Sequence, residues 1–173
     1  QNIMLLTASY IFYGWWDVRF LSLILASTAV DYLLGQNLAI ATNTLKRKLL
    51  LTASMCFNLG LLGIFKYYNF FMENFMEMAS IVGFSTNPTL LNIALPVGIS
   101  FYTFQTMSYT IDIYRNKLEP TKDIIAFATF VGYFPQLVAG PIERASNLLP
   151  QISKSRYFDY QKAVDGMRQA LWG

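Results

Sequence analysis

Long stretches without a charged side chain dominate the first half of the chain. Residues 3–16 and 49–65 contain no Asp, Glu, Lys or Arg, and residues 20–41 contain only Asp31. About 20 helical residues, each rising ~1.5 Å, cross the hydrocarbon core of a membrane. These stretches predict transmembrane helices and argue against a soluble fold.

The composition favours the same class of protein. Hydrophobic residues make up 54% of the chain and charged residues 13%, whereas soluble domains carry about 25% charged residues. Lys46, Arg47 and Lys48 form one basic loop, and residues 115–122 form another. The positive-inside rule places both loops in the cytoplasm. We expect apolar spans at about residues 3–16, 19–38, 49–65, 92–113 and 124–142.

Several kinds of site are excluded by residue types that the sequence lacks. It contains no histidine, so these residues can form no histidine metal site, histidine general base or Ser-His-Asp triad. The single cysteine, Cys56, excludes an intrachain disulfide and a cysteine metal cluster, and we interpret it as a buried small hydrophobic residue. The net charge of +3, without a basic run interleaved with aromatic residues, argues against nucleic-acid binding.

Segments outside the spans are expected to lie at the surface. Residues 67–81 predict an amphipathic helix at the membrane interface or capping the bundle, and its acidic face favours a protein contact. Residues 83–88 predict a turn, and residues 144–173 a surface segment in which Asp159 caps a helix. The polar face of residues 67–81 consists of Asn69, Glu73, Glu77 and Ser80, and the apolar face of Phe71, Phe75 and Met78.

The candidate functional site lies in the fourth and fifth spans. Polar side chains recur every three or four residues after Pro96 and Gly98, and such a stripe on a membrane helix should face protein or water. We predict that the stripe lines a substrate tunnel, and hydrogen bonding between helices is the alternative, because it is common inside membrane bundles. Its members are Tyr102, Gln105, Tyr109 and Asp112, with Ser108 beside them, and Asp112 could instead pair with Arg115.

The fifth span is interrupted by glycines and prolines. If it crossed the membrane fully, the basic segment after it would lie outside, so we predict a re-entrant element that returns to the same side. Labelling of Asn43 and Ser153 from opposite sides would contradict this. The alternative for the glycines and prolines of this span is a kinked helix without a ligand role. The alternative for the two charged residues that follow them is a structural ion pair or an interface anchor. The predicted wall residues are Pro135, Gln136, Gly140 and Pro141, and the charges that could contact the donor or acceptor are Glu143 and Arg144.

Three blocks of this sequence resemble the membrane-bound O-acyltransferase family, and within it the alginate O-acetyltransferase branch. They are ASYIFYGWWDVRFLSLILASTAVDYLLG, LPVGISFYTFQTMSYTIDIYR and FVGYFPQLVAGPIERASNLLPQI. The resemblance keeps their order and spacing and covers nearly the whole chain. It implies an all-α, polytopic membrane protein with tilted transmembrane helices, in addition to the re-entrant element and interfacial helices expected above.

The resemblance also implies an activity. The full-length protein would move an acetyl group from acetyl-CoA toward an extracytoplasmic polysaccharide, with an extracytoplasmic partner protein taking over the acyl group, in the bacterial inner membrane. The family histidine lies on a later helix, so we expect residues 1–173 to be the N-terminal part of a single acyltransferase domain and inactive alone. No catalytic residue, bound cofactor or metal site is assigned within them. The alternatives from other classes are a membrane transporter and a non-catalytic scaffold of an envelope assembly.

Overall fold

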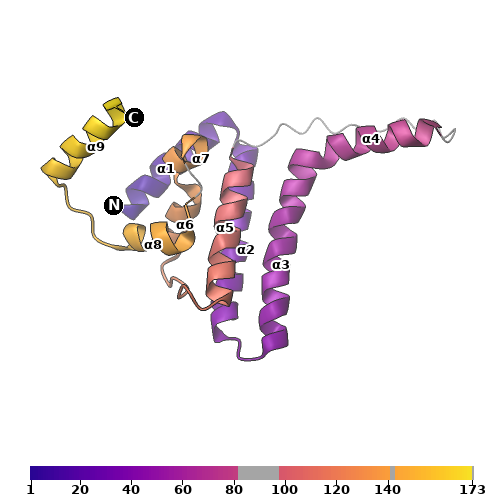
Figure 1. The fold of residues 1–173 in the computed structure, drawn as a ribbon, viewed down its shortest axis with the longest axis horizontal. Coiled ribbons are helices and arrows are strands. Elements are labelled where there is room, and N and C mark those ends of the chain that lie inside the picture. Colours follow the sequence, from indigo (N-terminus) through magenta and orange to yellow (C-terminus); the bar gives the residue numbers. More distant parts are fainter. Residues whose placement is uncertain (82–97, 141–142, 173) are drawn as a thin grey trace.

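The computed structural model describes residues 1–81, 98–140 and 143–172, and within these ranges the regular secondary structure is entirely helical (Figure 1). The all-α prediction is thereby confirmed. Two helices, α2 and the continuous α3–η1 segment, are long and apolar enough to cross a membrane. The helices are α1 Asn2–Trp16, α2 Val18–Ile40, α3 Thr44–Leu62, the π-helical turn η1 Gly63–Tyr67, α4 Tyr68–Ile81, α5 Ile99–Tyr114, α6 Ile124–Gly132, α7 Phe134–Ala139, α8 Ala145–Ser153 and α9 Tyr160–Trp172.

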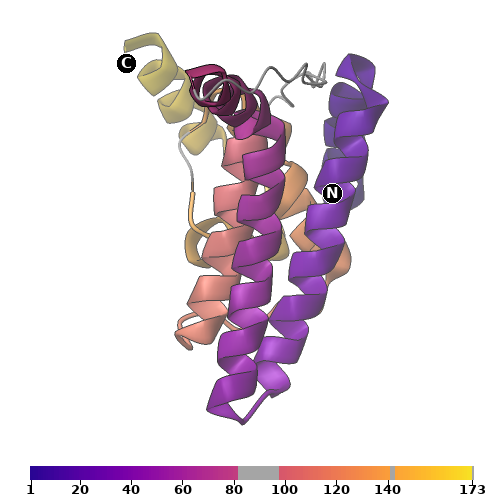
Figure 2. The same cartoon turned by 90° about the vertical axis from the view of Figure 1, so that its right-hand side faces the viewer.

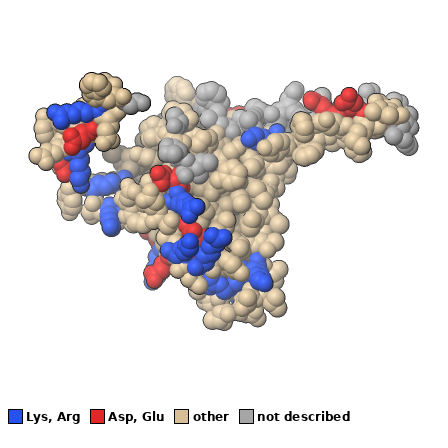
Figure 3. Space-filling view, viewed as in Figure 1, with Lys and Arg blue, Asp and Glu red and all other residues tan. Residues whose placement is uncertain are grey.

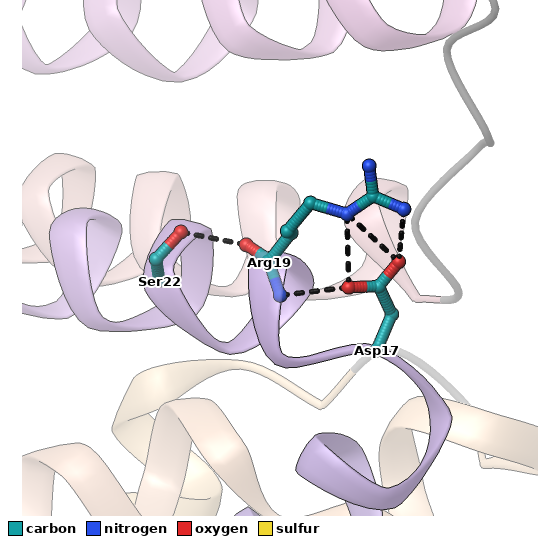
Figure 4. A network of polar contacts seen from close by, with 3 residues as sticks. All are labelled: Asp17, Arg19 and Ser22. Carbon is teal, nitrogen blue, oxygen red and sulfur yellow. Dashed lines mark hydrogen bonds and ion pairs between the residues drawn. The ribbon is translucent and has the colours of Figure 1, made fainter.

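Asp17 separates the first two helices and caps the second. Its Oδ1 accepts a hydrogen bond from the backbone N–H of Arg19 at 2.8 Å, and the Arg19 guanidinium binds both carboxylate oxygens (Figure 4). Ser22 Oγ donates to the Arg19 carbonyl one turn later. These hydrogen bonds hold the pKa of Asp17 below its usual value. The extended backbone at Asp17 ends α1 and starts α2 in a new direction.

Arg47 joins the two basic loops at one end of the bundle. Its guanidinium donates hydrogen bonds to the carbonyl oxygens of Leu38, Ile113 and Tyr114 and to Asn116 Oδ1, at 2.8–3.3 Å. The end of α2, the start of α3 and the end of α5 therefore meet at one place. This geometry agrees with the expectation that both loops lie on the same side of a membrane.

The central helix of the bundle is α5. It packs against α2, α3, α6 and α8, and its Tyr102, Tyr109 and Ile113 belong to the hydrophobic core. It starts at Gly98, whose φ of 77° is a left-handed conformation that favours glycine. Pro96 and the predicted turn at residues 83–88 lie outside the described residues.

The predicted amphipathic helix is present as α4. It continues α3 through η1 and projects sideways from the bundle, and Figure 2 shows it nearly end-on at the opposite end from the α2–α3 loop. Its side chains Phe71, Phe75 and Met78 are each more than 60% exposed. Within the described residues, the apolar face of α4 is thus not covered by the bundle.

The fifth span is split as its glycine and prolines predict. Tyr133 adopts an extended conformation between α6 and α7. Farther along the chain, α8 packs on both α5 and α6, and Ser153 and Arg156 line the same surface groove as Asp123, which starts α6. The chain after α7 has therefore returned to the end of α6 at which it entered, as expected for a re-entrant element.

The C-terminal segment differs in part from the expected surface segment. The buried residues Ala145, Leu149 and Ile152 attach α8 to the core, because every third or fourth residue of this short helix is apolar. By contrast, α9 has no buried residue, and Asp159 Oδ1 caps it by accepting from the N–H groups of Gln161 and Lys162. Cys56 is also exposed rather than buried, because it lies on the outward face of α3, where an apolar residue can face lipid.

Candidate functional site

Polar side chains of α5 point toward two different neighbours. On one face, Gln105 meets α6 and α7, and on another, Thr106 and Thr110 meet α2 and α3. A helix surrounded by other helices can bury polar residues on several faces if each finds a partner. The two groups are described in turn.

The structure brings together two predicted site residues from different spans, Gln105 and Gln136. Gln105 is 1% exposed, and its Nε2 donates to the Phe130 carbonyl at 2.8 Å and to Gln136 Oε1 at 3.3 Å. In an uninterrupted helix the Phe130 carbonyl would accept from the N–H of Phe134, but that N–H points to Ser9 Oγ at 3.4 Å. Gln105 thus satisfies a carbonyl that the break between α6 and α7 leaves free.

Tyr102 lies one helical turn from Gln105. It is 1% exposed, and neither its hydroxyl nor that of the neighbouring Thr103 has a hydrogen-bond partner in the described part of the chain. Desolvating a hydroxyl without a hydrogen bond costs about 1–3 kcal/mol, so such groups are uncommon in folded proteins and often have a functional reason. These two hydroxyls could bind a polar atom, as could the Tyr109 hydroxyl farther along α5, which is also buried without a partner in the described part of the chain.

Of the other members of the predicted stripe, Ser108 and Tyr109 make structural contacts, whereas Asp112 has an oxygen without a partner. Ser108 Oγ donates to the Gln105 carbonyl at 2.7 Å and accepts from the N–H of Ala145 at 3.3 Å, which fixes the start of α8. Tyr109 is fully buried, with its ring centroid 4.5 Å from that of Phe127. Asp112 is 7% exposed, and its Oδ2 has no hydrogen-bond partner among the described residues. The alternative ion pair with Arg115 is absent from the ion pairs of the described ranges.

The remaining predicted residues do not join the Gln105 cluster. Pro135 is exposed on the first turn of α7. Gly140 ends that helix, and a Cβ there would lie 2.8 Å from the Cα of Gln136. Glu143 Oε2 accepts from Asn147 Nδ2 at 2.7 Å, and the exposed Arg144 precedes α8. Pro141 lies outside the described residues.

A second polar cluster was not assigned to the site by sequence reasoning, which required Asp31 to be paired, protonated or facing water and favoured a structural contact. Asp31 is completely buried in α2. Its Oδ1 accepts from Ser54 Oγ at 2.5 Å and its Oδ2 from Asn58 Nδ2 at 2.7 Å. Thr106 Oγ1 donates to Asn58 Oδ1, and Thr110 Oγ1 hydrogen-bonds to Ser54 Oγ. The spacing of four residues between Ser54 and Asn58, and between Thr106 and Thr110, is a signal that could have revealed it.

The pairing of Asp31 agrees with the structural contact expected from its place in an apolar span. No ion pair in the described part of the chain involves it, so neutral donors from α3 surround the carboxylate. Among the same residues, no group of three side chains could hold a metal ion.

Comparison with known proteins links the whole chain to O-acetylases. It is 38% identical over 175 residues to the "probable alginate O-acetylase AlgI" of Azotobacter vinelandii and 40% identical over 177 residues to that of Pseudomonas aeruginosa. It is 29% identical over 192 residues to the peptidoglycan O-acetyltransferase of Helicobacter pylori. The alignments cover 96–100% of this chain. No family model and no solved structure matches it.

The chain spans about a third of the length of these relatives, between 33% and 36%. The resemblance read from the three sequence blocks is confirmed. Together with the two helices long enough to cross a bilayer, it indicates a membrane protein.

Proposed function

We propose that this chain, a relative of the alginate O-acetylases, is the N-terminal part of a membrane O-acyltransferase domain whose catalytic histidine lies on a later helix. The full-length protein would transfer acetyl from acetyl-CoA toward an extracytoplasmic polysaccharide. The observation that carries the proposal is the 38–40% identity to alginate O-acetylases along the entire chain. The peptidoglycan O-acetyltransferase relative makes a second envelope polymer the alternative acceptor.

The chemistry requires a site that both reactants can reach. Acetyl-CoA is made in the cytoplasm and the polymer lies outside, so the reaction needs a passage within the protein. A general base would take the proton of the acceptor hydroxyl as that oxygen attacks the thioester carbonyl and the CoA thiolate leaves. These 173 residues include no histidine. Their part in the reaction would be to shape the passage and position the acyl group.

We assign that positioning role to the Gln105 region of α5. Gln105 fixes the break between α6 and α7, and the buried Tyr102 hydroxyl beside it has no partner in the described part of the chain. Hydrogen-bond donors in a water-poor site stabilise a developing oxyanion more strongly than they would in water. The predicted lining role of Tyr102, Gln105, Ser108, Tyr109, Asp112, Pro135, Gln136, Gly140, Pro141, Glu143 and Arg144 belongs to this proposal.

The proposal also specifies location and partners. The protein would cross the bacterial inner membrane several times, with the basic loops in the cytoplasm. An extracytoplasmic partner protein would receive the acetyl group and pass it to the polysaccharide. The lateral helix α4, at the opposite end from the basic loops, is one described element placed to meet it.

The test is acetyl transfer by the full-length protein in sealed vesicles supplied with labelled acetyl-CoA and partner protein. We expect label on the acceptor with full-length protein and none with residues 1–173 alone. Gln105→Leu should lower kcat by ~100-fold, because displacement of a positioning element by about 1 Å can cost that much. The exposed Gln161→Leu on α9 is the matched control.

Three outcomes would contradict the proposal. Passage of acetyl-CoA or polymer across the membrane without covalent acetylation would make the protein a transporter. Unchanged acetylation with the Gln105 variant would remove the positioning role. Transfer by residues 1–173 alone would show that the catalytic group lies within them.

A further inference from the structure

A polar cavity lies where the two basic loops meet, apart from the proposed acyl-transfer site. It has a volume of about 510 Å³, within the range of about 300–1,000 Å³ typical of ligand sites. Its walls come from the end of α2, the start of α3, the end of α5 and the loop after α5. Its polar lining consists of Arg47, Asn116, Lys117 and Glu119.

The charge around this cavity is strongly positive. Residues 41–48 and 115–123 contain six basic side chains against two acidic ones, Glu119 and Asp123. In the described part of the chain, no ion pair involves any of these eight. Figure 3 shows Lys and Arg atoms gathered over the lower part of the bundle, where the loops lie. The cavity is lined by Glu119 as well as Arg47 and Lys117, but the basic side chains are in excess, and an excess of positive charge beside a concave surface attracts an anion.

Arg47 gives the cavity a fixed positive wall. Its guanidinium is held by three backbone carbonyls and Asn116 Oδ1, so the position of the charge is set by neutral groups that do not cancel it. Lys117 lies on the same cavity with an exposed, flexible side chain. The cavity therefore combines one immobile cation with one that can close over a ligand.

The position of the cavity selects among anions. It lies at the ends of α2 and α3, the two helices long and apolar enough to span a bilayer. Exposed Ile40, Leu45 and Leu49 lie next to this end of the helices. An anion there would sit at the level of the lipid headgroups, with apolar surface beside it for acyl chains.

We propose that this cavity binds the phosphate headgroup of an anionic phospholipid from the cytoplasmic leaflet. Arg47 and Lys117 contact the phosphate, and Lys46, Lys48, Arg115 and Lys122 supply the surrounding field. The lipid would tie the α2–α3 hairpin to the end of α5, the junction that Arg47 already holds from inside the protein.

The experiment exchanges the full-length protein into nanodiscs of phosphatidylcholine with or without about 20% phosphatidylglycerol, an anionic lipid. Native mass spectrometry then measures which lipid stays bound to the protein. We expect retained phosphatidylglycerol and no comparable retention of phosphatidylcholine. Lys117→Gln should lower phosphatidylglycerol binding by about fivefold, the equivalent of ~1 kcal/mol per basic residue near the surface. The matched control Lys162→Gln, exposed on α9, should leave binding unchanged.

Two results would overturn the proposal. Equal retention of both lipids, or equal loss in the two lysine variants, would mean that the cavity does not select a headgroup. Displacement of phosphatidylglycerol by inorganic phosphate, but not by chloride at the same ionic strength, would assign the cavity to a soluble phosphate compound instead. Because Lys117 is exposed and its side chain makes no hydrogen bond to the described residues, its variant is expected to fold, and retained helicity by circular dichroism checks this.

Discussion

The Asp31 carboxylate is enclosed by three helices, and neutral donors rather than a cation satisfy both of its oxygens. The sequence could indicate that this charge needed a partner, because an acid in an apolar span is costly. The four-residue spacing of Ser54 and Asn58 indicates that both lie on one face of α3, but not that this face meets Asp31. The pairing depends on the rotation of α3 about its axis, which only tertiary packing sets.

Removing this carboxylate should weaken the bundle. In Asp31→Ala, the buried Ser54 hydroxyl and Asn58 amide lose their hydrogen-bond acceptor. We expect this loss to lower the free energy of unfolding by about 1–3 kcal/mol. Thermal unfolding of the detergent-solubilised protein measures the effect. Asp165→Ala, the same substitution at an exposed position of α9, is the control, and equal stability of the two variants would contradict a structural role for Asp31.

Gly35 of α2 lies against α5 with no room for a side chain. A Cβ at this position would lie 2.6 Å from Cε1 of the fully buried Tyr109 and 3.2 Å from Cδ1 of Ile113. Gly35→Ala should therefore destabilise the protein by about 1–3 kcal/mol through overpacking. Gly60→Ala on α3 has no atom within 4 Å of the new Cβ, so it should be neutral or slightly stabilising. If thermal unfolding showed Gly35→Ala to be more stable than Gly60→Ala, α2 and α5 would not be packed as described.

Among the helices, the split fifth span is the element whose course matters most for the site. The sequence predicted the break from the glycines and prolines of this span, because proline removes a helical hydrogen bond and glycine disfavours the helix. It did not predict that Gln105 would satisfy the freed Phe130 carbonyl, because that contact joins residues 25 positions apart. It also did not predict α8, whose helix is too short for its apolar spacing to stand out.

The return of the chain after α7 can be tested by labelling. After Cys56→Ser, single cysteines at Thr42 and Ser153 should both react with a membrane-impermeant maleimide from the same side of sealed vesicles. The reason is that Ser153 shares a groove with Asp123, at the end of α6 that follows the basic loop. A cysteine at Glu77 on α4 should react from the other side. Reaction of the Thr42 and Ser153 cysteines from opposite sides would mean that α6–α7 crosses completely.

The amphipathic helix α4 should lie flat on a hydrophobic surface. Its Phe75 is 65% exposed in the bundle, and burying such a ring against lipid or a partner protein is favourable by about 1.5–3 kcal/mol. In the same Cys56→Ser background, a cysteine replacing Phe75 should react with maleimide at least several-fold more slowly than one replacing Glu77. Equal rates would mean that α4 stands free in water.

In the molecule as a whole, the two ends of the bundle are chemically different. One end gathers the basic loops around Arg47, and the other carries α4 and the start of α5. The distribution of charge along the sequence predicted this polarity, because loop charges alone set it. The sequence could not predict that α5 would be surrounded by other helices, because a polar stripe is compatible with either a tunnel wall or a helix contact. Gln105 and Ser108 make such contacts.

The central claim is that these residues form part of an O-acyltransferase whose catalytic histidine lies farther along the chain. The most direct measurement is the sequence of the gene downstream of the codon for Gly173. We predict an open reading frame that continues through further apolar spans and encodes a histidine within a membrane helix, preceded by a polar residue. A stop codon soon after Gly173, with no histidine encoded before it, would contradict the claim.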